Sequence, residues 1–241
     1  MKRYSQWIGS ILLLGFSLNT AWAAENTPSV EEIQERYTQA IGGREAFGRC
    51  RTRLMKGTLE WVGEGTTQTI EIAFQIPGQF YRSVSTLDGP MVQVLSGEKG
   101  WVQNPGEPTR EAVGAELDRL KRQMLFQGQL DLKRAFSRVS VTGKGTVGQH
   151  PVWIVEAVPA EGEPERFLFD AATGLLLQHE STPEIWGEKT LVVASLEDYR
   201  DVDGVKLPFT IRQTGDDLTI RFKEIRHNVP IDEGKFAKPP S

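Results

Sequence analysis

Apolar residues recur at every second position through most of this chain, and that period restricts the fold more than any other feature. Residues 55–61 and 70–76 show it clearly, and Gly63-Glu64-Gly65 separates the two stretches. A period of two places alternate side chains on opposite faces of a β-strand, and a glycine-rich break between two such runs predicts a hairpin. The sequence therefore predicts antiparallel strands with one apolar face.

Further strands follow at a regular spacing. They are predicted near residues 80–86, 91–95, 101–103, 139–142, 151–158, 166–170, 175–180, 190–199, 205–213 and 218–226. In the last of these, the step between the apolar residues Phe222 and Ile225 is three instead of two, which predicts a β-bulge near Lys223 and Glu224. We expect a mainly β (α+β) fold, an unclosed antiparallel half-barrel of about ten or eleven strands.

An N-terminal helix is predicted before the first strand. Ser29 and Glu32 form a capping box, an apolar stripe runs through residues 30–41, and Gly42-Gly43 supplies a left-handed stop. A short second helix is predicted at residues 44–50. Both helices precede the region of alternating residues.

Residues 104–137 interrupt the strand pattern. Apolar residues recur at helical spacing from Leu117 to Met124, and Gly128 separates them from a second short apolar stripe. A sheet of this length curls, and its apolar concave side needs a cover. We expect two helices joined at Gly128 to form a lid on the concave side. The lid residues are expected to be Leu117, Leu120, Met124 and Phe126.

The first 23 residues have the pattern of a secretory signal peptide. Lys2 and Arg3 form a basic start, residues 8–18 form a short apolar run, and Ala21-Trp22-Ala23 is a small-x-small cleavage pattern. An apolar run of about eleven residues is shorter than the roughly 20 that a spanning helix needs. We expect a periplasmic protein whose mature part, residues 24–241, is a single domain.

Composition limits the classes of function. The sequence has 28 basic and 32 acidic residues, and its formal charge of −4 becomes −6 once Lys2 and Arg3 leave with the signal. This acidic balance disfavours nucleic acid and anionic membranes as partners. Cys50 is the only cysteine. Because Cys50 does not directly follow the cleavage site, no lipid anchor is expected. As a single cysteine without a disulfide partner, it is predicted to be a buried small hydrophobe.

Motifs for catalysis or metal binding are absent from the sequence. It contains no Gly-x-Ser-x-Gly elbow, no phosphate-binding Gly-rich loop and no His-Glu-x-x-His. His150, His179 and His227 have no metal-type spacing, and residues 198–204 are predicted to form an Asp-Gly hairpin turn and not a calcium loop. We expect no enzyme activity, no metal and no cofactor. A hydrolase would need serine, histidine and aspartate side chains to converge in space.

Several turn and strand motifs resemble those of a known family. They are YTQAIGGR (37–44), FDAATGLL (169–176), DYRDVDGVKLPF (198–209), HNVPID (227–232) and FAKP (236–239). Through them, essentially the whole mature chain resembles the LolA-like superfamily of periplasmic proteins, often described as outer-membrane lipoprotein-sorting proteins. The resemblance implies an unclosed barrel with a helical lid around a hydrophobic cavity, which carries lipoprotein acyl chains or other lipid. It also implies donor and acceptor proteins at the two membranes; we expect a monomer.

The carrier hypothesis gives the apolar strand faces a role. Each buried CH₂ of an acyl chain contributes about 0.8 kcal/mol, so an apolar wall can hold lipid in water. The candidate lining residues are Leu59, Trp61, Ile72, Phe74, Trp101, Phe209 and Ile211. The alternative is a ligand-free sensor or interaction module of the cell envelope with the same fold, in which these residues fill the interior.

Overall fold

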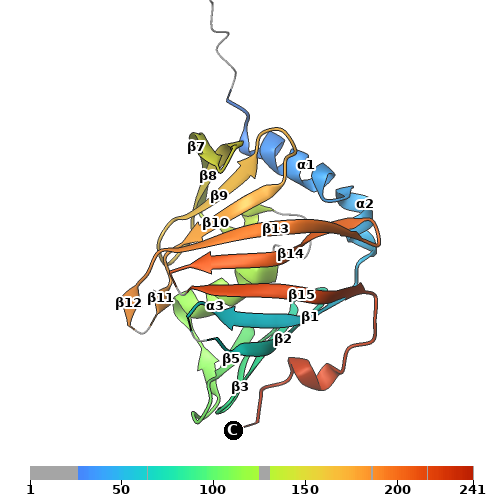
Figure 1. Cartoon of the computed structure of the whole chain (residues 1–241), viewed down its shortest axis with the longest axis vertical. Helices are drawn as coiled ribbons and strands as arrows, with labels where there is room; N and C mark the ends of the chain where they lie inside the picture. The colour runs from blue at the N-terminus through green and yellow to red at the C-terminus, as the bar shows by residue number, and fades with distance from the viewer. Residues whose placement is uncertain (1–26, 64, 125–130, 186, 216, 241) are drawn as a thin grey trace, which may run out of the picture.

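The protein is built around one large antiparallel sheet (Figure 1). A computed structural model describes residues 27–63, 65–124, 131–185, 187–215 and 217–240. The sheet has 13 strands in the order β6-β5-β4-β3-β2-β1-β15-β14-β13-β10-β9-β8-β7. Its strands are β1 Thr52–Trp61, β2 Thr67–Gln75, β3 Gln79–Thr86, β4 Gly89–Ser96, β5 Lys99–Gln103, β6 Arg110–Ala112, β7 Arg138–Val147, β8 His150–Val158, β9 Glu165–Asp170, β10 Leu176–Ser181, β13 Val192–Val202, β14 Val205–Thr214 and β15 Leu218–His227.

The first and last strands lie side by side at the centre of the sheet. β1 pairs with β15, so strands β2 to β6 extend to one side and the strands from β14 back to β7 extend to the other. β6 and β7 are therefore the two edges. The chain between them, residues 113–137, has to cross from one edge of the sheet to the other. The path of this connection decides what covers the middle of the sheet.

The sheet is mainly as the sequence predicts. Among the described residues β6 and β7 each pair with one neighbour, so the predicted unclosed antiparallel half-barrel is confirmed. The bulge is also confirmed, since the register between β1 and β15 shifts by one residue at Lys223. The hairpin between β13 and β14 turns at Asp203 and Gly204, with φ angles of 53° and 83°, as the Asp-Gly motif predicts.

The predicted number of ten or eleven strands is wrong. β6 lies in the stretch that we expected to contain only a loop and helices, because Pro105 and Pro108 precede it. Three residues of β6 pair with β5 and extend the sheet. Two further short strands, β11 (Glu184–Ile185) and β12 (Glu188–Lys189), form a separate hairpin.

Helices α1 (Val30–Ala40) and α2 (Gly43–Arg49) cover one part of the face that carries the apolar core, which we call the inner face. The capping box is present: the backbone N–H of Glu32 donates to Ser29, and that of Ser29 donates to the Glu32 carboxylate. Tyr37 of α1 packs edge-on against Phe169 of β9, with 5.6 Å between ring centroids. Both predicted N-terminal helices are therefore confirmed.

Helices α3 (Gly114–Gln123) and α4 (Leu132–Ala135) lie in the connection between β6 and β7. In Figure 1, α3 lies behind the central strands. A Cβ placed on Gly100 of β5 would lie 3.0 Å from a methyl group of both Leu117 and Leu120. The helix thus packs tightly on the inner face of β5. The predicted joint at Gly128 lies outside the described residues.

The C-terminal segment, residues 228–240, crosses the opposite, outer face, and we call it the C-terminal strap. Its 3-10 helix η2 (Glu233–Phe236) contacts β3 and β4, and the Phe236 side chain is 2% exposed. The carbonyl oxygen of Pro240 accepts hydrogen bonds from Gln103 and Thr109, at 3.1 and 3.0 Å. The strap therefore ties the end of the chain to the β5–β6 edge.

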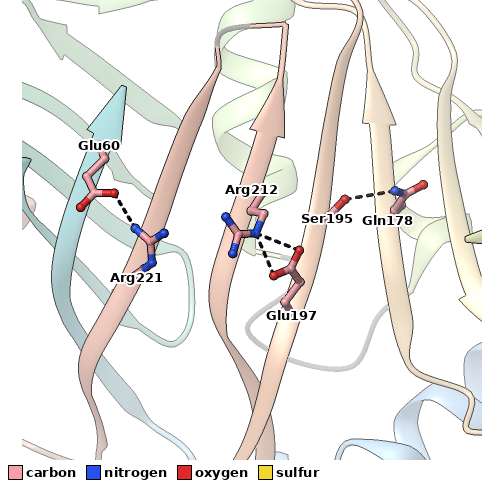
Figure 2. Close-up of polar contacts among 6 residues, drawn as sticks. All are labelled: Glu60, Gln178, Ser195, Glu197, Arg212 and Arg221. Atoms are coloured by element: carbon pink, nitrogen blue, oxygen red, sulfur yellow. Dashed lines mark hydrogen bonds and ion pairs between the residues drawn. The ribbon is translucent and has the colours of Figure 1, made fainter. Parts of the chain in front are cut away.

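Beside the strap, the outer face is polar. Figure 2 shows ion pairs that join neighbouring strands: Glu60 with Arg221 at 2.6 Å, and Glu197 with Arg212 at 2.9 Å. Gln178 of β10 donates to Ser195 of β13 at 3.0 Å in the same view. Exposed pairs of this kind contribute about 0–1 kcal/mol each. They keep this face solvated, so an apolar binding site has to lie on the inner face.

We predict that Phe236→Ala lowers the free energy of unfolding by about 3–5 kcal/mol, because it leaves a cavity under the strap. Leu87→Ala is the matched control, since the Leu87 side chain is 96% exposed at a hairpin tip. Urea denaturation of both variants measures the change. A Phe236→Ala protein as stable as the control would contradict the assigned role of the strap.

Candidate functional site

Side chains on the inner face of β1–β5 lie in rows that run across the strands, because paired residues of antiparallel neighbours share a face. The first row is Arg53, Phe74, Phe80, Leu95 and Gly100. The second row is Met55, Ile72, Arg82, Gln93 and Val102. The third row is Gly57, Ile70, Val84 and Met91. The first row is fully buried, with Arg53 as its polar side chain, and the second row contains Arg82 and Gln93.

A cavity of about 50 Å³ lies beside the second and third rows. It is lined by Leu59, Trp61, Arg82, Val84, Met91, Val92, Gln93, Val102, Gln103 and Asn104. One water molecule occupies about 30 Å³ of the liquid, so the cavity has room for only one or two water-sized groups. The Met91 side chain is 39% exposed, so the lining reaches the protein surface there.

Six of the seven predicted lining residues lie on the inner face. Leu59 and Trp61 line the cavity itself. Ile72 is half-buried beside it in the second row, and Phe74 is buried in the first row with its ring 5.2 Å from that of Phe80. Of these four side chains, only Trp61 and Ile72 have any appreciable exposure.

The two predicted residues of β14 lie further from the cavity. Ile211 pairs with Ile220 of β15, which pairs with Leu59, so this row continues the inner face across the centre of the sheet. Phe209 is buried, and the Arg200 guanidinium lies 4.5 Å from its ring centroid. The cavity therefore occupies only the β1–β5 part of the predicted wall.

The placement of Trp101 in the lining is wrong. Trp101 pairs with Val94 of β4, and Val94 lies on the outer face together with Tyr81 and Ala73. The inner residues of β5 are Gly100 and Val102. The C-terminal strap covers the outer face of β3 and β4, and β5 has an apolar residue on each face, Trp101 and Val102, so polarity does not distinguish the two faces of this short strand.

The predicted lid residues differ in how deeply they are buried. Leu120 is fully buried, and Leu117 and Met124 are half-buried against the core. Phe126 lies outside the described residues. The packing of Leu117 and Leu120 on Gly100 places α3 over the first row.

The sequence prediction missed most of the cavity lining, including Arg82, Val84, Met91 and Gln93. The strands that carry them were predicted, but Arg82 and Gln93 interrupt the apolar alternation, so the inner face of β3 and β4 could not be assigned. The feature that assigns these residues to the inner face is the pairing register of the strands. It aligns Arg82 with Ile72 on one side and Gln93 on the other.

A buried charged cluster joins α3 to the strands beyond the centre of the sheet. Arg122 pairs with Glu165 of β9 at 3.0 Å, and His179 of β10 lies 2.7 Å from the other carboxylate oxygen. Burial alone would raise the pKa of Glu165, but the hydrogen bond with His179 and the charge of Arg122 outweigh it and lower the pKa. At the other side of α3, Lys121 pairs with Glu98 at 2.5 Å. These ion pairs hold α3 across the inner face.

A second polar cluster lies under α2. Arg53 Nε donates to Nε2 of His227 at 2.9 Å, and both side chains are buried. Burial and the neighbouring Arg53 charge lower the pKa of His227 to about 4. Burial also raises the pKa of the Cys50 thiol, so this cysteine stays protonated and is buried, as predicted.

The described residues contain no group of three or more histidine, cysteine, aspartate or glutamate side chains that could hold a metal ion. His150 pairs with Asp170 at 2.8 Å, and Asp170 also caps the turn at Ala172 and Thr173.

Among the described residues, none of the helices has the length and apolarity needed to span a bilayer.

Comparison with known proteins identifies the fold. The sequence matches no protein-family model and no curated protein. A DUF1329 family protein from Desulfovibrio piger has a similar structure, with a TM-score of 0.60 and 12% identity over 86% of this chain and 97% of that chain. A LolA superfamily protein from Nitrosomonas europaea has a TM-score of 0.59 and 8% identity, over 88% and 98% of the two chains.

A third similar structure is an outer membrane lipoprotein-sorting protein domain from Vibrio parahaemolyticus, with a TM-score of 0.56 and 12% identity over 86% of this chain and 95% of that chain. The three matches cover nearly the whole length of each protein. The chain therefore has a LolA-like fold, as the sequence motifs predict.

We predict that the stability of the protein falls as the pH drops from about 6.5 to about 4, by about 3 kcal/mol from His227 alone. In this window the unfolded chain binds a proton at His227 and the folded protein does not, because its pKa is depressed. His227→Gln retains an acceptor for Arg53 and should flatten this part of the pH profile. Urea midpoints across the window measure it; an unchanged slope in His227→Gln would contradict the assignment.

Proposed function

We propose that this protein is a periplasmic carrier that binds lipoprotein acyl chains or other lipid against the inner face of its sheet and has no catalytic activity. The observation that carries the proposal is the apolar inner face, which α3 covers over the first row and which has a small cavity beside the second and third rows. The similar structures support it through two of their names, a LolA superfamily protein and a lipoprotein-sorting domain. The signal-like segment 1–23, which lies outside the described residues, supports export.

The small cavity sets a condition for this function. Pockets that enclose drug-sized ligands measure roughly 300–1,000 Å³, several times more than the cavity of about 50 Å³. An acyl chain therefore fits only if part of the cover moves. The cavity is lined by residues of β1 and β3–β5 and by Asn104, whereas α3 covers the neighbouring first row, where Leu117 and Leu120 pack on Gly100. We propose that α3 is the part of the cover that moves.

The contacts of α3 allow such a movement. It is held by the packing of Leu117 and Leu120 on Gly100 and by the ion pairs Lys121–Glu98 and Arg122–Glu165. An acyl chain that replaces the two leucine side chains covers the same apolar surface of the sheet. The apolar area that the helix exposes when it moves is therefore buried again by the ligand. The free-energy cost of opening then comes mainly from breaking the ion pairs and from rearranging the connection.

The second candidate function is a ligand-free interaction module of the cell envelope. The observation that favours it is the filled interior, since the first row and Leu120 are fully buried. In this case the inner-face residues serve only as a core. The two candidates differ in whether acyl chains enter, so binding of a fluorescent fatty acid distinguishes them.

Trp61→Glu should weaken the binding of a fluorescent fatty acid by about tenfold or more, because it places a charge in the apolar lining of the cavity. Trp101→Glu is the matched control, since Trp101 is also half-buried but lies on the outer face. Fluorescence titration of the two variants, with circular dichroism to confirm their folding, provides the measurement. Equal affinities in both folded variants would contradict binding at the inner face.

Arg122→Gln should speed the uptake of the same fatty acid by about tenfold or more, because it removes the charged contact between α3 and Glu165. Arg119→Gln is the control on the same helix, since Arg119 forms no ion pair with the residues that the structure describes. Stopped-flow fluorescence measures both rates. If the two variants take up the probe equally fast, the movement of α3 does not limit access.

A further inference from the structure

The cavity lining combines apolar walls with a polar pair. Of its residues only Arg82 carries a charge, and Leu59, Trp61, Val84, Met91 and Val102 supply the apolar surface. Arg82 and Gln93 are directly paired across β3 and β4 on the inner face. Their row continues to Ile72 on one side and Val102 on the other, so the polar pair lies in the middle of an apolar wall.

Gln93 has an unused acceptor. Its Oε1 atom is buried, and none of the described residues donates a hydrogen bond to it. The same holds for Oε1 of Gln68, which is paired with Leu59. Buried side-chain oxygens in native proteins nearly always accept a hydrogen bond, and Gln93 belongs to the cavity lining, so its Oε1 is an acceptor for a group that enters the cavity.

We infer that the cavity binds the polar head of an amphiphile, with a carboxylate or phosphate at Arg82 and a hydroxyl or N–H of the same head donating to Gln93. This inference rests on the proposed function and specifies its ligand. A guanidinium matches the paired oxygens of carboxylate and phosphate, and an amide oxygen accepts from a hydroxyl or N–H. The acyl chain then lies along Leu59, Trp61 and Met91 towards the surface.

The size of the cavity agrees with this orientation. About 50 Å³ holds one or two water-sized groups, such as the oxygens of a carboxylate or phosphate, but not an acyl chain, so only the chain has to lie outside the existing cavity. A cargo with no polar head would place CH₂ groups against Gln93 and leave its buried Oε1 atom without a donor. The lining therefore selects against fully apolar ligands.

A series of probes with one chain length and different heads tests the inference on the mature protein. The probes are dodecanoate, dodecyl phosphate, dodecyl maltoside and dodecyltrimethylammonium, used below their micelle concentrations to displace a fluorescent fatty acid. We expect the two anions to bind about tenfold tighter than the neutral and cationic probes. The stronger of the two anions identifies the head as a carboxylate, as in a fatty acid, or a phosphate, as in a lysophospholipid.

Two variants locate the selectivity. Arg82→Met should reduce the affinity for both anions to that of dodecyl maltoside, and Arg221→Met, which removes a cation from the outer face, should leave it unchanged. Equal affinities for all four probes in the wild-type protein would overturn the head-group inference and leave the carrier function intact. Failure of every probe to bind, the neutral one included, would overturn both.

Discussion

The fold depends on covering the apolar inner face of an open sheet. A closed barrel covers its own interior, but here β6 and β7 remain edges, so other segments have to exclude water from the inner face. α1 and α2 cover one part, and the connection from β6 to β7 covers another. Because β1 and β15 pair at the centre, this connection has to pass from edge to edge. Topology thus places a short helix, α3, over the first row of the inner face.

Much of the architecture follows from the sequence. Alternation predicted the strands, a three-residue apolar step predicted the bulge at Lys223, and the capping box at Ser29 predicted α1. Trp101 was misplaced because β5 has an apolar residue on each face, Trp101 and Val102, and the C-terminal strap gives the outer face of the neighbouring strands β3 and β4 a cover of its own. Arg82 and Gln93 were missed because their polarity hid the inner face of β3 and β4, which only the pairing register shows.

The balance between a filled core and a binding site is set by a few side chains. The first row is packed like any protein interior, whereas the second and third rows contain a cavity, a cation and an unused acceptor. α3 contributes only Leu120 as a fully buried anchor and otherwise relies on half-buried residues and ion pairs. Such an element has a low cost of local opening compared with the central strands. In the proposed function, this is the element that opens for the ligand.

The central claim is that acyl chains enter this fold in its own compartment. Native mass spectrometry of the mature protein, purified from the periplasm of its own cells without detergent, tests it most directly. The account predicts a complex heavier than the bare chain, whose extracted ligand contains an acyl chain. A bare chain that also fails to take up a fluorescent fatty acid would contradict the account and favour the interaction module.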